Sequence, residues 1–377
     1  MDRERTVSIL VTHSCNLKCA YCYEWHKDDV HISYDTAKQI IDNILLSEDK
    51  SKGDCITFEF FGGEPTLEFD LIKKIVEYSK TIKTTLKHNF FIPTNGTLLT
   101  SDDKLWLNAN KDLVIVGLSL DGTKRMHDLN RCNSFDSIDI DFFLKTYPEQ
   151  TIKLTISPQT LPMMSEGIIY CHKLGFLISC NLAYSIDWSH KKNIDIFSIE
   201  LKKLADYYLD NPDIKPCSFF EYNRLVTLSD DSPIISRSCG AGWNMEAYDC
   251  DGTKYPCQSF MPITIGKDNA EQVKNLILTQ DYVRTDVKSK CSDCPLLPAC
   301  PQCYVANYVG SKNIYQCQDD LCEMLKIQIK ACAYYVGKLF EKGRLDTTNE
   351  FNVRILKGVL KIQHYFEPDL DTSLIRA

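Results

Sequence analysis

Eighteen cysteines in a chain of 377 residues set the strongest limit on what this sequence can fold into. Six of them stand apart in the sequence and fit buried apolar positions: Cys55, Cys132, Cys171, Cys180, Cys217 and Cys332. The others gather in two groups, within residues 15–22 and 239–322. In a reducing compartment, grouped cysteines favour metal or cluster ligation over disulfides.

The rest of the composition favours such a compartment. No run approaches the ~20 apolar residues of a membrane-spanning helix. The charged start leads into Val7–Val11, an apolar segment too short for a signal peptide and followed by no small-residue cleavage site. We therefore expect a cytoplasmic globular protein of two or three domains. Its net charge of −8 argues against nucleic acid as the main partner.

The first 210 residues alternate short β-rich runs with amphipathic ones. The expected strands are Val7–Val11, Cys55–Phe61, His88–Pro93, Leu113–Leu120, Thr151–Ser157 and Phe176–Ala183. The expected helices are Tyr34–Leu46, Leu67–Ile82, Asp102–Asn108, Phe135–Lys145, Met163–Leu174 and Asp195–Leu209. Six strand–helix units in succession predict parallel strands with right-handed crossovers. Because eight units would close a full barrel, six predict an open, partial (β/α)6 barrel, with a doubly wound sheet as the alternative.

The pattern changes near Asn211–Pro216. Residues 239–322 are rich in Cys, Pro, Gly and Asp and have few periodic apolar runs. This segment is therefore expected to need bound metal ions or metal clusters in order to fold. A helix resumes over Cys322–Glu341, and another is expected over Phe351–Phe366. The predicted domains are residues 1–212, a linker 213–238, a cysteine-rich domain 239–341 and a helical tail 342–377.

The first cysteine group has a specific spacing. Cys15, Cys19 and Cys22 read C-x3-C-x2-C and directly follow the first expected strand. Three thiolates so close together can hold a four-iron four-sulfur cluster and leave one iron open for a small molecule. In parallel α/β folds this loop lies at the carboxyl end of the strands, where ligands bind. The alternative is tetrahedral zinc, with His13 or His26 as the fourth ligand.

The triplet resembles the cluster motif of the radical S-adenosylmethionine (SAM) superfamily, which has an aromatic residue before the third cysteine, here Tyr21. Further segments at consecutive strand ends look like those of the superfamily's peptide-modifying members. They are Phe61-Gly62-Gly63-Glu64-Pro65, Thr94-Asn95-Gly96, Ser119-Leu120-Asp121-Gly122, and His127-Asp128 with Arg131. The resemblance covers roughly residues 6–190.

The resemblance implies how the site works. Cys15, Cys19 and Cys22 would hold a cluster that binds SAM through its amino and carboxylate groups, with Glu64 near the ammonium and Arg131 near the carboxylate. The implied cofactor-binding residues are Tyr21, Gly62, Gly63, Glu64, Asn95, Ser119, Asp121 and Arg131. A donor such as flavodoxin or ferredoxin would reduce the cluster. Reductive cleavage of SAM would then give a 5′-deoxyadenosyl radical that abstracts hydrogen from the substrate.

The second cysteine group reads Cys239-x12-Gly252-x4-Cys257, then Cys291-x2-Cys294-x5-Cys300-x2-Cys303, then Cys322. This looks like the SPASM domain, which carries two auxiliary four-iron clusters; a pair of zinc ribbons is the alternative. The resemblance implies that Cys239, Cys257 and Cys303 hold the nearer cluster, and Cys291, Cys294, Cys300 and Cys322 the outer one. Cys250 is a further candidate for the nearer cluster, and Cys317 competes with Cys322.

The reaction is narrowed by one residue. Sulfatase-maturing members of the family carry an Asp directly after the second auxiliary cysteine, where it acts as a base. In this sequence the position is Gln258, whose amide cannot take up a proton. The resemblance therefore favours modification of a ribosomally made peptide by a thioether, C–C or C–O crosslink or by epimerisation. With the first strand near residue 6, we expect leader recognition by a separate protein, the tail or the barrel mouth. A non-catalytic iron–sulfur electron carrier is an alternative from another class, but it would leave the Gly–Glu motif unused.

Overall fold

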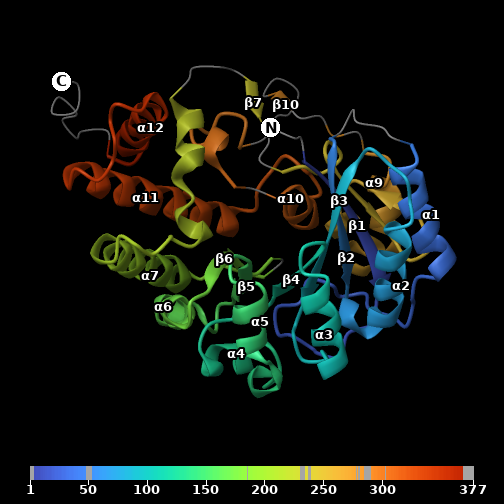
Figure 1. Cartoon of the computed structure of the whole chain (residues 1–377). Coiled ribbons are helices and arrows are strands. Elements are labelled where there is room, and N and C mark those ends of the chain that lie inside the picture. Colours follow the sequence, from blue (N-terminus) through green and yellow to red (C-terminus); the bar gives the residue numbers. More distant parts are fainter. Residues whose placement is uncertain are drawn as a thin grey trace. The chain divides into compact units, whose positions relative to one another are not determined.

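The structure is a computed structural model, shown in Figure 1. It describes residues 4–47, 53–184, 186–229, 234–236, 239–276, 278, 281–283, 290–301 and 303–367. The chain forms two compact units. The first unit consists of residues 1–154 and 239–280, and the second of residues 155–238 and 281–377. The chain therefore passes from one unit to the other more than once.

The first unit contains a six-stranded sheet in the order β4-β3-β2-β1-β8-β9. Its strands are β1 (Glu4–Thr12), β2 (Cys55–Gly62), β3 (Lys87–Thr94), β4 (Val114–Leu118), β8 (Met245–Tyr248) and β9 (Lys254–Tyr255). All neighbours are parallel except β8 and β9, which are antiparallel. Helices α1 (Tyr34–Leu45), α2 (Phe69–Ser79) and α3 (Ser101–Ala109) connect the first four strands.

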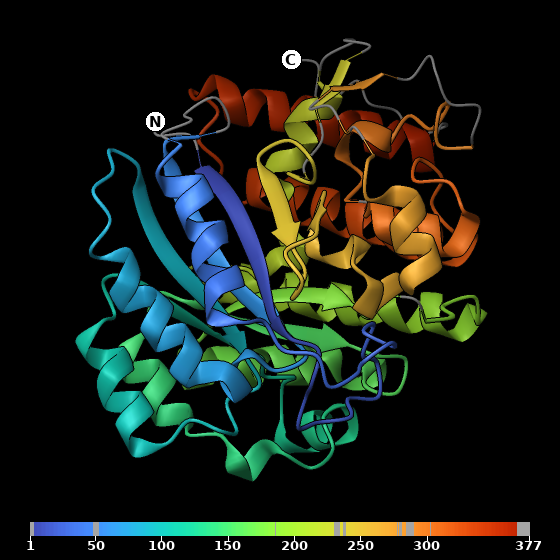
Figure 2. The ribbon, with the colours of Figure 1, turned by 90° about the vertical axis from the view of Figure 1, so that its right-hand side faces the viewer.

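Local sequence explains these elements. Figure 2 shows α1 and α2 in front of the sheet, with β8 in yellow beside β1 in dark blue. The Ser33 side chain accepts from the Thr36 N–H to begin α1, and Thr100 with Asp103 forms a capping box at the start of α3. The strands carry buried apolar residues, and the rings of Phe60 and Phe90 stack in the core at 5.4 Å.

Buried charges join β1 to the strands that come from the cysteine-rich part of the sequence. The Arg5 guanidinium pairs with Glu246 on β8, and Lys254 on β9 pairs with the same carboxylate at 2.5 Å. Burial raises the pKa of Glu246, but the Lys254 and Arg5 cations outweigh burial and hold that pKa below its ordinary value. This ion network fixes β8 and β9 as part of the sheet.

Shorter elements complete the first unit. After β4 come α4 (Lys124–Asn130), α5 (Ile140–Thr146) and the start of β5 (Thr151–Ile156). Ser119 and Lys153 form a parallel bridge, which continues the strand order toward β5. The turn η6 (Gln258–Phe260), α8 (Pro262–Ile265) and α9 (Lys267–Val273) follow β9.

The second unit is mainly helical. Its helices are α6 (Met164–Leu174), α7 (Lys191–Asp210), α10 (Tyr304–Ser311), α11 (Asp319–Glu341) and α12 (Glu350–Phe366), with 3-10 helices η5 (Tyr222–Leu228) and η8 (Leu297–Ala299) among the connections. Strand β5 forms a two-stranded sheet with β6 (Leu177–Leu182). A second two-stranded sheet consists of β7 (Ile234–Ser236) and β10 (Asp281–Val283), which are antiparallel. An apolar core joins η5, η8, α11 and α12.

The predicted class of fold, α/β with a partial barrel and a cysteine-rich C-terminal region, is confirmed, and each of the six predicted strands is present. Sequence reasoning missed α4 and the short strands and helices of residues 234–311, which are β7, β8, β9, β10, α8, α9 and α10. The domain limits at residues 212, 238 and 341 stay predictions. Residues 230–233, 237–238 and 368–377 of the predicted linker and tail lie outside the described residues.

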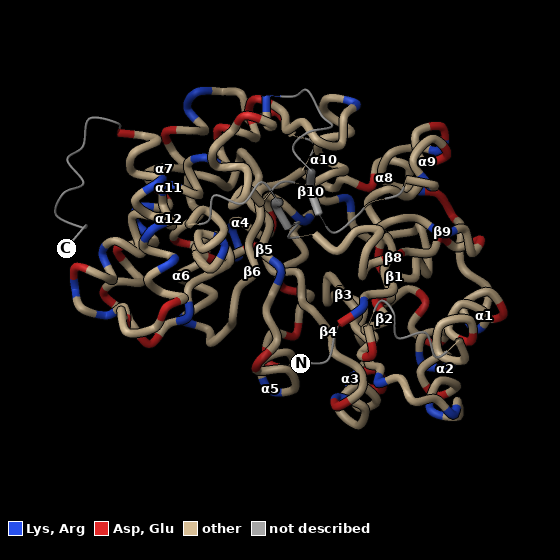
Figure 3. Tube along the Cα trace, turned by 90° about the horizontal axis from the view of Figure 1, so that it is seen from above, with Lys and Arg blue, Asp and Glu red and all other residues tan. Residues whose placement is uncertain are grey.

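The hydropathy of the helices and the distribution of surface charge also bear on what the protein can contact. Among the described helices, none is both long enough and apolar enough to cross a bilayer. In Figure 3, both acidic and basic residues lie on α1, α2 and α3, so none of these helices carries charge of one sign only. The Lys38–Asp42 pair on α1, at 2.6 Å, is an example of these surface pairs.

Candidate active site

The three-cysteine motif lies on the loop after β1, residues 14–22, here called the cluster loop. The loop folds on itself: the Leu17 N–H donates to the Cys15 Sγ at 3.4 Å, and the Cys22 N–H donates to the Cys19 carbonyl at 3.1 Å. Lys27 Nζ donates to the Cys22 Sγ at 2.9 Å. Burial raises the pKa of Cys19 to about 11, and the nearby Cys22 and Cys15 thiols add to that rise. Binding a metal cluster would therefore require the displacement of thiol protons.

Two glycines at the end of β2 bring its backbone against the cluster loop. The Gly63 N–H donates to the Thr12 carbonyl at 3.0 Å, and the Glu64 N–H donates to the Ser14 carbonyl at 2.9 Å. A Cβ atom on Gly63 would lie 2.3 Å from the Ser14 oxygen, and one on Gly62 would lie 2.7 Å from the Thr12 oxygen. Only glycine allows this approach.

Glu64 is buried and hydrogen-bonded on both carboxylate oxygens. Its Oε1 accepts from the Thr66 N–H at 3.1 Å, the Thr66 hydroxyl at 2.5 Å and the Thr94 hydroxyl at 2.6 Å. Its Oε2 accepts from the Asn95 N–H at 2.8 Å. Burial raises the pKa of Glu64, and these donors act in the opposite direction. Since a carboxylate oxygen accepts about two hydrogen bonds, Oε2 retains capacity for one more donor.

The end of β3 is tied to the cluster loop by side chains. Asn95 Nδ2 donates to Asn16 Oδ1 at 2.8 Å, and Asn16 Nδ2 donates to the Thr97 hydroxyl at 2.9 Å. The Asn95 Oδ1 in turn accepts from the Thr97 N–H at 3.0 Å. Asn95, predicted from its motif, therefore shapes the loop around the cysteines, and Asn16 is its unpredicted partner.

Asp121 is the centre of a buried polar cluster after β4. Its Oδ2 accepts from the Tyr21 hydroxyl at 2.7 Å, from Arg131 Nε at 3.0 Å and from Asn130 Nδ2 at 3.1 Å. The Arg131 guanidinium lies over the Tyr21 ring, 5.4 Å from its centroid. The Ala20 N–H donates to the Asn130 carbonyl at 2.8 Å. The cluster loop is thus held against α4, an element that the sequence did not predict.

Two other residues singled out in the sequence have structural contacts here. The Ser119 N–H donates to the Thr94 carbonyl at 2.8 Å. Burial lowers the pKa of His127 to about 4, and its Nδ1 accepts from the Asp121 N–H at 3.3 Å while Nε2 lies 3.0 Å from the Ser134 hydroxyl. The imidazole is therefore neutral and carries its proton on Nε2.

The second unit gathers five cysteines. The Cys317 N–H donates to the Cys291 Sγ at 3.4 Å. Burial raises the pKa of Cys300 strongly, and the nearby thiols of Cys317, Cys322, Cys294 and Cys291 raise it further. Cys294 and Cys300 also pack against the apolar core of this unit. The structure therefore brings together all four cysteines expected at the outer cluster, together with Cys317.

The cysteines expected at the nearer cluster are divided between the units. Cys239 and Cys257 belong to the first unit and Cys303 to the second, so their common ligation stays a prediction. Cys250 lies in the turn after β8, where its Sγ contacts the Leu10 carbonyl at 3.3 Å. Gln258 follows Cys257, and its buried Oε1 has no hydrogen-bond partner among the described residues.

Comparisons with known proteins agree with this geometry. Residues 9–139 match the model of the radical SAM superfamily. The chain is a radical SAM enzyme. It is 27% identical to a cysteine-type anaerobic sulfatase-maturating enzyme of Clostridium perfringens over 284 residues, which cover 66% of this chain and 72% of that protein.

Two solved structures share the fold of this radical SAM enzyme. Native anSMEcpe with bound AdoMet and the Kp18Cys peptide has a TM-score of 0.68 at 19% identity, covering 90% of this chain and 99% of that one. Streptococcus suis SuiB bound to precursor peptide SuiA has a TM-score of 0.55 at 18% identity, covering 85% and 76%.

The residues present fit the cofactor of a radical SAM enzyme. The cluster loop offers three thiols and no fourth cysteine, as a cluster with one open iron requires. The rings of His13 and His26, the alternative zinc ligands, have other neighbours: His13 pairs with Asp28 and Asp249, and the His26 ring lies beside Gly266. The structure thus favours iron–sulfur ligation by the triplet over zinc.

Proposed function

We propose that this radical SAM enzyme is a peptide maturase, which abstracts hydrogen from a ribosomally made peptide and so forms a crosslink or another modification. The observation that carries the proposal is the convergence of three strand-end segments on the cluster loop, through Glu64, Asn95 and Asp121. The sulfatase-maturating relative and the peptide-bound likenesses support a peptide or protein substrate.

The chain's own residues would divide the work at the first cluster. Cys15, Cys19 and Cys22 would hold the cluster, which when bound with SAM supplies reductive cleavage to a carbon radical. Glu64 would receive the methionine ammonium at the remaining acceptor site of Oε2. Arg131 would face the methionine carboxylate while Asp121 orients its guanidinium. Their burial keeps water from a reactive radical.

The auxiliary cysteines would serve electron transfer or substrate binding. Cys291, Cys294, Cys300 and Cys322 would hold the outer cluster, with Cys317 as a competing ligand. Cys239, Cys257 and Cys303 would hold the nearer cluster, with Cys250 as a further candidate. Three four-iron clusters would bring the total to about 12 irons per chain. A separate leader-recognition protein and an external electron donor are the expected partners.

Oxidation of Cys or Ser to formylglycine, as in sulfatase maturation, is the second candidate because of the Clostridium perfringens relative. Its weakness is Gln258, since an amide cannot act as a general base near neutral pH. The Oε1 of Gln258, which has no hydrogen-bond partner among the described residues, could instead accept a hydrogen bond from an N–H group of the substrate. A non-catalytic electron carrier is a third candidate, but it would not explain why Glu64 is buried and held by four hydrogen-bond donors.

The proposal is tested in two stages. Anaerobically reconstituted, reduced protein should release 5′-deoxyadenosine from SAM, and the Cys15, Cys19 and Cys22 triple alanine variant should release none while retaining about 8 of about 12 irons. Co-expression with short peptides from neighbouring genes should then yield a mass change in one of them. Reduced protein that binds iron but never cleaves SAM would leave only the electron carrier.

Variants at the nearer cluster separate the two enzymatic candidates. Cys257→Ala should keep SAM cleavage, which belongs to the cluster loop, but stop peptide modification. Gln258→Ala should keep peptide-modifying activity within about tenfold of the parent, because no proton is taken up there. An activity that collapses in Gln258→Ala and returns in Gln258→Asp would instead establish the sulfatase-maturating type of chemistry.

A further inference from the structure

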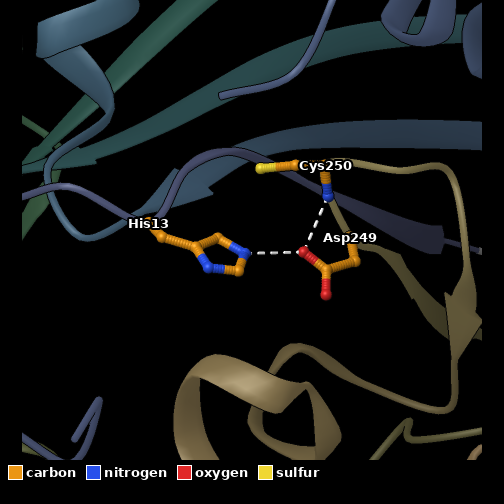
Figure 4. A group of neighbouring side chains, drawn as sticks. All are labelled: His13, Asp249 and Cys250. Carbon is orange, nitrogen blue, oxygen red and sulfur yellow. Dashed lines mark hydrogen bonds and ion pairs between the residues drawn. The ribbon is translucent and has the colours of Figure 1, made fainter. Parts of the chain in front are cut away.

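We propose that His13, Asp249 and Cys250 form a second kind of metal site, which binds one divalent transition-metal ion, with zinc as the best match. The three side chains come from the end of β1 and from the residues after β8, neighbouring strands of the first unit (Figure 4). Their ligand atoms all lie within 4.8 Å of one another, and all three residues are buried. The site is distinct from the cysteine triplet and needs no iron–sulfur cluster.

The donor set matches zinc chemistry. A histidine nitrogen, a carboxylate oxygen and a thiolate are the three donor types that zinc takes in proteins. Tetrahedral bonds of about 2.0–2.3 Å separate ligand atoms by roughly 3.3–3.8 Å. His13 Nε2 and Asp249 Oδ1 are 2.8 Å apart, so they would part by about half an ångström to admit the ion. A water molecule or the second oxygen of Asp249 would complete the tetrahedron.

The surroundings of His13 support ligation by Nε2. Asp28 Oδ1 lies 2.6 Å from His13 Nδ1, on the opposite side of the ring. This contact lacks the geometry of a hydrogen bond, so Asp28 acts on the ring as a neighbouring negative charge. Nε2, which lies 2.8 Å from Asp249 Oδ1, is the nitrogen on the side of the proposed ion.

The charge around Cys250 also favours a cation. The carboxylates of Asp28 and Asp249 lie 2.6 Å and 2.8 Å from the two ring nitrogens of His13, and the Cys250 N–H donates to Asp249 Oδ1 at 2.7 Å. Two carboxylates therefore stand at the site, whereas His13 is the one group among the three ligands that can carry positive charge. A divalent ion would neutralise this excess and displace the thiol proton.

The proposed ion would fasten the start of the cluster loop to the turn between β8 and β9. His13 lies two residues before Cys15, and Asp249 and Cys250 open that turn. The proposal removes Cys250 from the nearer auxiliary cluster, which would then keep an open iron. The function proposed above does not depend on this ion, so each can fail alone.

The test uses full-length protein whose iron sites are filled anaerobically. After exposure to Zn²⁺ and desalting, it should retain about one zinc per chain in addition to its iron. His13→Gln and Cys250→Ser should each lower zinc affinity at least tenfold with iron content unchanged, because each removes one of the three protein ligands. Cys55→Ser, a cysteine at the start of β2, is the matched control and should keep the zinc.

Cobalt identifies the thiolate directly. Co²⁺ bound to the iron-loaded protein should show thiolate-to-cobalt charge-transfer absorption, which should persist in Cys55→Ser and vanish in Cys250→Ser. Iron-loaded wild-type protein without stoichiometric zinc and without this absorption would overturn the proposal, leaving an imidazolium held between two carboxylates. Loss of iron in Cys250→Ser would also overturn it, by assigning Cys250 to the auxiliary cluster. If Cys250→Ser does not fold, His13→Gln and the wild-type cobalt spectrum decide.

Discussion

The absence of a side chain at Gly63 lets the cluster loop pack directly against the end of β2. Because a Cβ atom there would meet the Ser14 backbone at 2.3 Å, Gly63→Ala must push the loop away from β2. We expect loss of SAM cleavage by at least tenfold, since a small misplacement of reacting groups is costly. Measurement of 5′-deoxyadenosine release checks this. Iron at the auxiliary sites should be retained, and an alanine variant with wild-type cleavage would show that the loop can yield.

The five gathered cysteines lead to a second prediction. Cys317 and Cys322 both lie within reach of the thiols of Cys291, Cys294 and Cys300, while a four-iron cluster takes four protein ligands. We expect each single serine variant to keep the outer cluster, through exchange of one ligand for the other. The double variant should lose about four irons.

Mössbauer and EPR spectra provide the decisive measurement for this pair. An altered but present cluster signal in one single variant identifies the ligand used in the wild-type protein. Loss of about four irons in Cys322→Ser alone would contradict exchange and would leave Cys317 as a donor of its N–H to Cys291.

His127 supplies a dependence on pH. Its pKa is lowered to about 4 by burial, whereas an unfolded histidine titrates near 6.5. Between these values the unfolded chain binds a proton that the folded chain does not, so stability falls as the pH falls. From pH 7 to pH 5 the loss should be about 2 kcal/mol.

Urea unfolding at the two pH values checks this prediction. The decrease in stability should be smaller in His127→Gln by about that amount, while the exposed His364→Gln should behave like the parent. An unchanged pH dependence in His127→Gln would mean that other groups dominate.

At the scale of elements, two glycines on neighbouring helices behave oppositely. A Cβ atom on Gly358 of α12 would lie 2.1 Å from the Leu225 carbonyl of η5, whereas one on Gly337 of α11 would meet no atom within 4 Å. Gly358→Ala should therefore destabilise the second unit by about 1–3 kcal/mol or more. Gly337→Ala should stabilise it by about 0.5–1 kcal/mol, because alanine favours helix.

Thermal unfolding of the two variants tests this prediction. Both changes add the same methyl group to a helix, so opposite shifts in midpoint isolate the close crossing of α12 and η5. Equal shifts would show that α12 can move away from η5 without cost.

Elements were predictable where they were long enough to show a period. The strands β1 to β6 have five to nine residues, and the burial pattern of β2 alternates strictly along its length. By contrast, β8 and β9 have four and two residues, too few for any pattern to appear. Helix α4 has seven mostly polar residues and was missed for the same reason.

The parts of the candidate site that are encoded in short local motifs were predictable, and the long-range contacts were not. Cysteine spacing and the Gly–Glu motif name residues close together in sequence, so their chemistry can be read from the chain itself. The contacts of Asn16 with Asn95 and of Ala20 with Asn130 join residues about 80 and 110 positions apart. Such contacts depend on tertiary folding and leave no local signal. The His13–Asp249 contact joins residues 236 positions apart and is of the same kind.

At the scale of the whole molecule, the first unit is discontinuous in sequence. Its sheet includes β8 and β9, which follow the first segment of the second unit, residues 155–238, in the sequence. We therefore expect residues 1–212, expressed alone, to aggregate, because β1 would lose a neighbour and Arg5 would be left buried without Glu246.

Size-exclusion chromatography beside the full chain checks this expectation. Recovery of residues 1–212 as a soluble monomer that retains the sheet's circular dichroism would contradict it. The predicted boundary at residue 212 would then mark an autonomous domain.

The parallel pairing of β1 with β8 also governs how the protein is made. About 230 residues separate the two strands, so a ribosome adding roughly 5–20 residues per second needs some 10–50 seconds after finishing β1 before its partner exists. During that interval one edge of β1, a strand with mostly buried residues, is open to other chains. Cells that make this enzyme should thus depend on chaperones during synthesis, and the cluster loop would acquire its final shape only when translation is well past its midpoint.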